Sequence, residues 1–119
     1  EVRVVRSGVR PQSVRGFLES IPWLFQREHS EGLSAVYHFS FTGPQAREAT
    51  VTIRERSLRV DAGLVGTPDV HVNADGSSWI KFLGGDLPLW KMLLTRRLRL
   101  SPRVNGARLL ARFGRCFPR

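Results

Sequence analysis

The stretch from Val36 to Ile53, VYHFSFTGPQAREATVTI, decides the fold of this chain, because apolar and polar residues alternate in it twice. In the first run Tyr37, Phe39 and Phe41 alternate with polar residues, and Gly43 with the proline after it ends that run. Successive side chains of a strand point to opposite faces, so each run predicts a strand with one apolar face. Such regular alternation is typical of an antiparallel sheet that packs one face on a core and leaves the other in water.

The same period of two continues beyond Ile53. Leu58 and Val60 alternate with charged residues, and the run from Val70 to Asp75 alternates in the same way. The break from Gly63 to Pro68, rich in turn residues, separates these two runs. We therefore expect four strands within residues 36–75.

On both sides of this segment the apolar period is that of a helix. The first helical segment is expected to break after Ser20, because Pro22 cannot continue a helix without losing a hydrogen bond. After the sheet, Ser77 is the expected N-cap of a helix that Gly84 and Gly85 end. The expected elements are a helical segment at 11–26, the sheet at 36–75, helices at 77–95, a short strand at 96–100 and a C-terminal helix at 103–117.

Length and composition limit the class of protein. A chain of 119 residues, 41% hydrophobic and 24% charged, is typical of one globular domain, here residues 1–119.

The single Cys116 cannot form an internal disulfide, which favours a reducing, cytoplasmic setting. Arg115 beside it could lower the thiol pKa and make Cys116 a labelling site. The longest apolar stretches fall far below the run of about 20 residues that spans a bilayer. The chain begins at Glu1, not at a methionine, which favours a domain cut from a longer protein.

The charge of the chain is strongly positive. Nineteen Lys and Arg, seventeen of them Arg, stand against ten Asp and Glu, a net charge of +9. Such a chain could bind polyanions through counterion release. However, the arginines are spread over the N-terminal tail, the polar face of the sheet and the last helix, without a recognised nucleic-acid motif, so nucleic acid is not an expected partner. The C-terminal concentration is expected to contact an anionic head group or an anionic membrane surface: Arg96, Arg97, Arg99, Arg108, Arg112 and Arg115.

Three stretches make the chain resemble the sterol carrier protein type 2 family over about Ala35 to Phe117. They are Tyr37-His-Phe-Ser-Phe-Thr-Gly43, Thr67-Pro-Asp-Val-His-Val-Asn-Ala-Asp75 and Trp79 to Leu87. The resemblance implies an α+β fold in which helices cover one face of a five-stranded, largely antiparallel sheet, with an apolar tunnel between the two layers. It also implies noncatalytic binding of a lipid or other hydrophobic molecule in that tunnel, such as a sterol, a fatty acyl chain or a quinone, with transfer as a further role.

The chain departs from the family pattern around the short strand at 96–100. The family usually has a glycine just before this strand and a Gly-Asp turn after it. Here Arg96 and the stretch Ser101-Pro102-Arg103 take those places. We therefore expect a different turn geometry and leave open how the last helix lies.

The apolar faces of the helices are the candidate ligand-binding site. Burying a large apolar side chain stabilises by about 1.5–3 kcal/mol whether its neighbour is protein or ligand, so composition does not separate a packed core from a lined tunnel. The alternative is therefore a structural, regulatory or dimerisation module of a larger protein with a filled tunnel. The residues expected to contact a ligand are Trp79, Phe82, Leu83, Trp90, Leu93, Leu110, Phe113 and Phe117.

The sequence gives little support to a catalytic or metal site. His38 and His71 lie on polar strand faces that the resemblance places close together. With Asp75 they could in principle hold a metal ion, but neither Asp75 nor another residue stands at a convincing spacing for a third ligand. No Gly-x-Ser-x-Gly motif and no Gly-rich phosphate loop is present. We expect no catalytic residue, no bound metal and no cofactor, and hence no enzyme.

Overall fold

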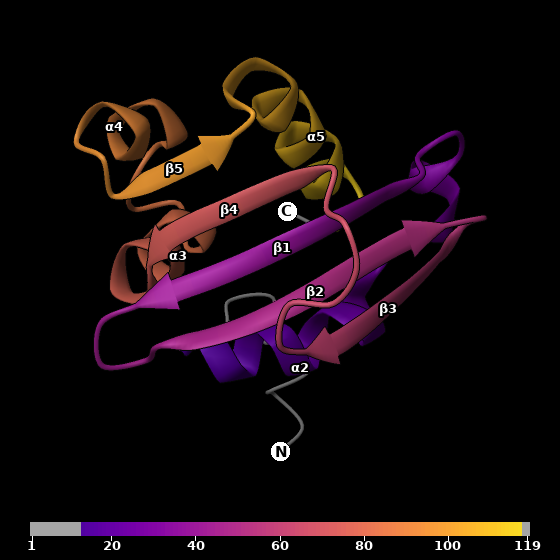
Figure 1. Cartoon of the computed structure of the whole chain (residues 1–119), viewed down its shortest axis with the longest axis horizontal. Helices are drawn as coiled ribbons and strands as arrows, with labels where there is room; N and C mark the ends of the chain where they lie inside the picture. The colour runs from indigo at the N-terminus through magenta and orange to yellow at the C-terminus, as the bar shows by residue number, and fades with distance from the viewer. Residues whose placement is uncertain (1–12, 118–119) are drawn as a thin grey trace.

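The computed structural model describes residues 13–117 (Figure 1). Residues 11 and 12 of the predicted first helical segment, and the last two residues of the chain, lie outside the described residues. The elements are α2 (Val14–Leu24), the 3-10 helix η1 (Arg27–Ser30), β1 (Ala35–Thr42), β2 (Arg47–Arg54), β3 (Ser57–Ala62), β4 (Val70–Asp75), α3 (Gly76–Leu83), α4 (Leu89–Leu94), β5 (Leu98–Ser101) and α5 (Arg103–Arg115).

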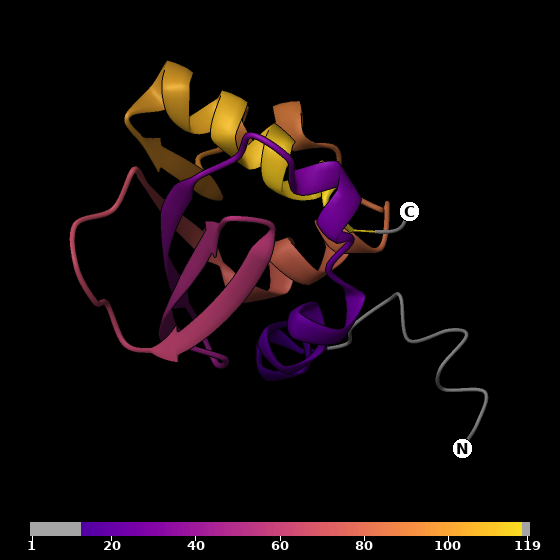
Figure 2. The same cartoon turned by 90° about the vertical axis from the view of Figure 1, so that its right-hand side faces the viewer.

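The five strands form one sheet in the order β3-β2-β1-β4-β5. The pairs β1–β2, β2–β3 and β4–β5 are antiparallel, whereas β1 and β4 run parallel. Figure 2 shows α2, α3 and α5 together on one side of this sheet. The structure thus confirms the predicted α+β fold, with a five-stranded, largely antiparallel sheet covered by helices on one face.

The core lies between the sheet and these helices, as the alternation predicts. Tyr37 of β1 pairs with Val51 of β2 and with Val70 of β4, and all three side chains are buried. Two residues further along β1, Phe39 pairs with Val72 in the same way. Side chains at every second position of neighbouring strands share one face, so these residues form a continuous apolar surface under the helices.

Helix α2 is continuous where the sequence predicted a break. Its N-cap is Ser13, whose hydroxyl accepts a hydrogen bond of 2.9 Å from the backbone N–H of Gly16. It continues through Pro22 to Leu24, so the expected restart after Ser20 is wrong. Only two helical residues follow the proline, so the hydrogen bond that it cannot make is lost from the last turn alone.

The N-cap of α3 is Asp75 and not Ser77. The Asp75 carboxylate accepts hydrogen bonds from the backbone N–H of Ser78 at 3.0 Å and from its hydroxyl at 2.8 Å. A carboxylate at this position also interacts favourably with the positive end of the helix dipole. Because Asp75 is at once the last residue of β4, the strand leads into α3 without a loop. The end of α3 agrees with the prediction, since Gly84 caps it and Gly85 has a φ of 84°.

The turn before β5 contains an arginine in a backbone conformation that favours glycine. Arg96 has a φ of 61° and lies before the strand, which begins at Leu98 rather than at residue 96. The backbone N–H of Arg97 then donates to the Met92 carbonyl at 2.9 Å. Arg96 therefore does not prevent the left-handed turn that a glycine would make there, although a Cβ disfavours that conformation.

Replacing Arg96 with glycine is expected to raise the free energy of unfolding by about 0.5–1 kcal/mol, because it relieves the left-handed strain of a residue with a Cβ. Arg97→Gly is the matched control: it removes the same charge and adds the same unfolded-state freedom, but its φ is not in that region. Urea denaturation of the two variants measures the difference. Equal losses of stability in both would contradict the assignment of strain to Arg96.

Candidate ligand-binding site

Aromatic side chains from four elements meet between the sheet and the helices. We call this group the aromatic cluster: Phe17 of α2; Tyr37, Phe39 and Phe41 of β1; Trp79 of α3; and Phe113 of α5. Every member is buried, with at most 4% of its surface exposed. Phe39 contacts every other member of the cluster. The ring centroid of Trp79 lies 5.4 Å from that of Phe17 and 5.6 Å from that of Phe39, and both pairs meet edge to face. Such edge-to-face contacts are the favoured geometry of aromatic pairs.

The aromatic contacts continue from the cluster to two partly exposed ends. At one end the ring centroid of Phe82 of α3 lies 5.4 Å from that of Trp79. At the other end the ring centroid of Phe117 lies 4.9 Å from that of Phe113, and the ring centroid of Phe25 lies 6.0 Å from that of Phe117. All three of these end residues are only partly buried. A line of aromatic contacts therefore runs through the interior and reaches the surface on two sides.

Two polar groups inside this region differ in their partners. The Tyr37 hydroxyl donates a hydrogen bond of 2.7 Å to the Leu109 carbonyl, and burial raises the pKa of Tyr37 well above its ordinary value, so the phenol stays neutral. The indole Nε1–H of Trp79 is buried and has no hydrogen-bond partner among residues 13–117. A buried donor left unpaired costs about 1–3 kcal/mol, so the Trp79 donor is the one polar group here that calls for an explanation.

The structure divides the eight predicted ligand contacts into two sets. Trp79, Leu110 and Phe113 are buried, and Phe82, Leu83 and Phe117 pack against the same core. Trp90 and Leu93 do not lie in the interior, since 65% and 38% of their surfaces are exposed. Only Met92 of the short helix α4 is buried, and Trp90 lies about 200° from it around the helix, so Trp90 faces away from the core and its contact with a ligand stays a prediction.

Sequence reasoning placed no residue of β1 or α2 among the ligand contacts. These two elements nevertheless supply four members of the aromatic cluster, whose rings contact the same neighbours as the rings of Trp79 and Phe113: Phe17, Tyr37, Phe39 and Phe41. The signal was present, because three aromatic residues alternate on the apolar face of β1. The alternation predicts that this face is apolar but does not tell which helices lie over it, so it does not distinguish a packed core from a lined tunnel.

The predicted basic residues fall into two groups on different elements. Arg96, Arg97 and Arg99 are exposed in and after the turn that follows α4. Arg108 and Arg115 are exposed on α5, whereas Arg112 is partly buried as a residue and its guanidinium donates to the Glu31 carbonyl at 3.1 Å. Phe113 of α5 packs into the core, so its ring is not available to a partner at the surface, whereas Arg108 and Arg115 are.

The first basic group adjoins exposed apolar side chains. We call this surface the α4 corner: Trp90, Lys91, Leu93, Leu94, Arg96 and Arg97, all exposed. Leu94 is 74% exposed and lies one turn after Trp90 on the same side of the helix. The α4 corner thus combines an aromatic ring, leucine side chains and cationic groups on one surface.

Cys116 is not the reactive thiol that its neighbour Arg115 suggested. The side chain is fully buried, and burial raises the pKa of the thiol. The nearby cation that opposes this shift is Arg112, and its effect is the smaller one. The expectation that Cys116 is a labelling site is therefore corrected, because less thiolate forms at neutral pH than for a free cysteine.

Cys116 is expected to react with a thiol reagent at pH 7.5 at least tenfold more slowly in the folded protein than in urea, because the thiol is both buried and less ionised. Its reaction rate should rise with pH above the range where a free cysteine ionises, since its pKa is raised. Time courses with a chromogenic disulfide measure both effects. A folded-state rate equal to that in urea would show that the α5 end is open.

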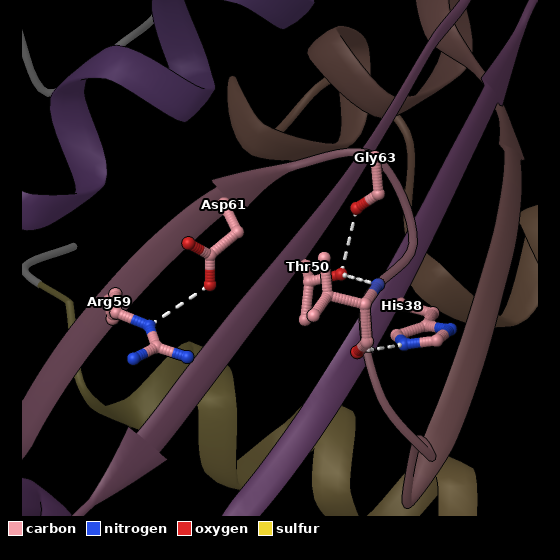
Figure 3. A network of polar contacts seen from close by, with 6 residues as sticks. His38, Thr50, Arg59, Asp61 and Gly63 are labelled. Atoms are coloured by element: carbon pink, nitrogen blue, oxygen red, sulfur yellow. Dashed lines mark hydrogen bonds and ion pairs between the residues drawn. The ribbon is translucent and has the colours of Figure 1, made fainter.

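The outer face of the sheet carries a polar network that holds the loop after β3 (Figure 3). The Thr50 hydroxyl donates to the Gly63 carbonyl and accepts from the Val65 N–H, both at 2.8 Å. His38 lies beside Thr50, and its Nε2–H donates to the Val65 carbonyl at 2.9 Å. These bonds fix the loop over the outer face, on the side opposite the aromatic cluster.

The two histidines that the resemblance places close together are direct neighbours in the sheet. His38 and His71 are register partners, with ring centroids 6.1 Å apart, and His71 Nε2 lies 2.9 Å from the Ser40 hydroxyl. Within residues 13–117, no group of three or more His, Cys, Asp or Glu side chains could hold a metal ion. Among the described helices, none has the length and apolar character needed to cross a bilayer.

Comparison with known proteins gives one family match and several structural likenesses. Residues 21–105 match the sequence model of the SCP-2 sterol transfer family. A comparison with functionally curated proteins finds no match.

Three solved structures illustrate the structural likeness. The stereoselective inverting sec-alkylsulfatase Pisa1 from Pseudomonas sp. is similar over 87% of this chain, with a TM-score of 0.73 and 16% identity, but the chain spans only 16% of that protein. Sterol carrier protein 2-like 2 from Aedes aegypti, whose palmitated form has also been solved, has a TM-score of 0.66 and 16% identity over 93% of this chain and 97% of its own. The ubiquinone synthesis protein UbiJ-SCP2 has a TM-score of 0.60 and 16% identity, over 93% and 90% of the two chains. At such identities the likeness shows the fold alone.

Proposed function

This chain belongs to the SCP-2 sterol transfer family, and from that premise we propose that it binds a lipid or another long hydrophobic molecule between its helices and its sheet. The observation that carries the proposal is the line of aromatic contacts that runs from Phe82 to Phe25 by way of Trp79, Phe39, Phe113 and Phe117. Its middle is buried and its two ends are partly exposed, which suits a long molecule that enters at the surface. Apolar ligands need mainly shape and buried area, with a few polar contacts for orientation.

The ligand class is a long apolar molecule with few polar atoms. The family is named for sterol transfer, the Aedes aegypti relative has been solved in a palmitated form, and UbiJ-SCP2 is a ubiquinone synthesis protein. Sterols, fatty acyl chains and quinones share this character. A ligand of this kind fits the rings of the aromatic cluster, whose side chains are hydrocarbon apart from the Tyr37 hydroxyl and the Trp79 indole.

We propose binding without chemical turnover. Catalysis needs a group that can give or take a proton or attack the ligand, held close to it. In the aromatic cluster the Tyr37 hydroxyl is committed to the Leu109 carbonyl, and its raised pKa keeps it protonated. The buried free thiol of Cys116 needs no oxidising compartment, which supports a cytoplasmic location for such a carrier.

A fluorescent fatty acid, titrated into the delipidated protein, tests this function. We expect saturable binding of one probe per chain, with quenching or energy transfer from Trp79, the buried tryptophan. Unlabelled sterol, palmitate and a quinone then compete for the probe, and their order of potency gives the ligand class. Absence of any saturable site would overturn the proposal.

We further propose that the ligand is exchanged at an anionic membrane, with the α4 corner as the surface that docks there. Tryptophan and leucine side chains that are exposed next to Lys and Arg suit the boundary between head groups and acyl chains. Lys91, Arg96 and Arg97 complement the negative charge of the bilayer surface, and each contributes about 1 kcal/mol near it.

Flotation with vesicles that do or do not contain phosphatidylserine tests the docking surface. The double variant Arg96→Glu/Arg97→Glu is expected to lose at least tenfold in affinity for the anionic vesicles, since two attractions of about 1 kcal/mol each become repulsions. Arg47→Glu/Arg54→Glu, which makes the same charge change at exposed sites on β2, is the matched control and should lose less. Binding that ignores lipid charge and salt would remove the membrane proposal.

The alternative is a structural, regulatory or dimerisation module of a larger protein, with a filled interior. Its support is the sulfatase likeness, in which the shared fold makes up 16% of a longer chain. Leu110→Trp distinguishes the two functions, because Leu110 is buried on α5. In a carrier the larger ring weakens probe binding more than stability, whereas in a filled core it lowers stability by about 1–3 kcal/mol and no probe binds at all.

A further inference from the structure

The indole N–H of Trp79 is the polar group that the packing of the interior does not explain. It is buried and has no hydrogen-bond partner in the described part of the chain. Its ring neighbours Phe17, Phe39, Phe41 and Phe82, at 5.4–5.8 Å between centroids, carry no oxygen or nitrogen in their side chains. An aromatic face is only a weak acceptor, so these rings do not replace a proper partner.

The other buried polar groups near the helices have partners, which sets Trp79 apart. The Tyr37 hydroxyl reaches the Leu109 carbonyl, and the Ser78 hydroxyl, one residue from Trp79, reaches the Asp75 carboxylate. Packing alone could be served by phenylalanine, which fills a core without adding a donor. A tryptophan whose donor is left without a partner in the buried part of the proposed binding site therefore points to an acceptor that comes with the ligand.

Resting on the binding function proposed above, we propose that Trp79 Nε1–H donates a hydrogen bond to a neutral carbonyl oxygen of the bound molecule, and that it selects carbonyl-bearing ligands over hydrocarbons. The acceptor is neutral because the rings around Trp79 are uncharged. A carboxylate would lose its hydration there without a counter-charge, whereas a carbonyl oxygen needs only the one donor. Fatty esters and quinones both supply such an oxygen.

The site differs from the head-group contact expected at Arg96, Arg97 and Arg99. Those arginines are exposed and suit a charged group at the surface, whereas Trp79 lies on the buried part of the aromatic line. A ligand held by Trp79 is therefore placed with its carbonyl in the interior. The hydrogen bond fixes how far the molecule enters, a role that apolar contacts alone perform poorly because they are not directional.

Nuclear magnetic resonance of the indole N–H signals tests this on the unmodified protein. The chain has three tryptophans, and the Trp79 signal is identified by its loss in Trp79→Phe. Methyl laurate and a decyl benzoquinone are the carbonyl probes, and tetradecane is the hydrocarbon of matched length. We expect the Trp79 proton to move downfield with a carbonyl probe and to keep its position with tetradecane; the two carbonyl probes show whether an ester or a quinone is the better ligand.

Competition against the fluorescent fatty acid gives the affinities. Trp79→Phe is expected to weaken methyl laurate binding about threefold to tenfold, the size of one net hydrogen bond, and to change tetradecane binding less than twofold. Trp23→Phe, which alters a ring that is 88% exposed, is the control and should change neither. If methyl laurate binds but the Trp79 signal stays in place and Trp79→Phe binds it equally well, this inference is wrong while the binding function stands. If none of the probes binds, the binding function itself is wrong, and this inference with it.

Discussion

Replacing Phe113 with alanine is expected to lower the free energy of unfolding by about 3–5 kcal/mol. Phe113 joins α5 to the sheet and to α2: its ring lies 5.1 Å from Tyr37, 5.6 Å from Phe39 and 6.4 Å from Phe17. Truncation removes these contacts and leaves a cavity that a rigid sheet cannot close. Since a domain of this size has about 5–15 kcal/mol of stability in all, the variant should be close to unfolding at 37 °C. Chemical denaturation followed by circular dichroism measures the loss.

Val104→Ala is the control for Phe113→Ala, because it shortens a side chain on the same helix that is 68% exposed. It should change stability by no more than about 0.5 kcal/mol. A loss below about 1 kcal/mol for Phe113→Ala would contradict the packing of α5 on the aromatic cluster.

The two glycines of α5 are expected to respond in opposite directions to alanine. A Cβ on Gly106 would lie 2.8 Å from the Val70 Cγ2 and 3.2 Å from the Leu100 Cβ, closer than side chains approach without movement. Gly106→Ala should therefore destabilise by about 1–2 kcal/mol, since overpacking outweighs the gain in helix propensity of about 1 kcal/mol. A Cβ on Gly114 meets nothing within 4 Å, so Gly114→Ala should stabilise by about 0.5–1 kcal/mol.

Thermal or urea denaturation of both glycine variants in parallel measures this pair. The sign of the difference matters more than its size, because both substitutions add the same methyl group to the same helix. A stabilising effect of equal size at both positions would mean that α5 lies further from β4 and β5 than the structure places it.

The sheet could be predicted from the sequence because burial on one face imposes a period of two. Every second residue of β1, from Tyr37 to Phe41, is buried against the helices, and the partner strands follow the same rule. The resemblance to the sterol carrier family rests on these strands and on Trp79 to Leu87, and the family match over residues 21–105 confirms it.

Local details depended on contacts that a pattern does not contain. Asp75 caps α3 because β4 leads into the helix without a loop, and this became visible only with the strand end in place. Arg96 has the backbone conformation of a glycine, which residue type alone argues against. Arg96 shows that tertiary structure can override a local preference when the surrounding elements fix the chain.

The candidate site was predicted in part, for a reason that lies in helix length. On α5, a helix of 13 residues, the apolar period identified Leu110 and Phe113 correctly as inward residues. On α4, with six residues, the apolar side chains surround the helix, so no period distinguishes Met92, which is buried, from Trp90, which is exposed. The unpaired donor of Trp79 could not be predicted either, because only packed neighbours show that an N–H lacks a partner.

Native mass spectrometry of the protein as purified from cells, without added lipid, tests the binding function most directly. We predict a species heavier than the bare chain by the mass of one lipid, which collisional activation releases, and which organic extraction recovers as one molecule per chain. Delipidated protein should regain the heavier species when a total lipid extract is added. A spectrum that shows only the bare chain, both as purified and after incubation with that extract, would contradict the proposed binding function.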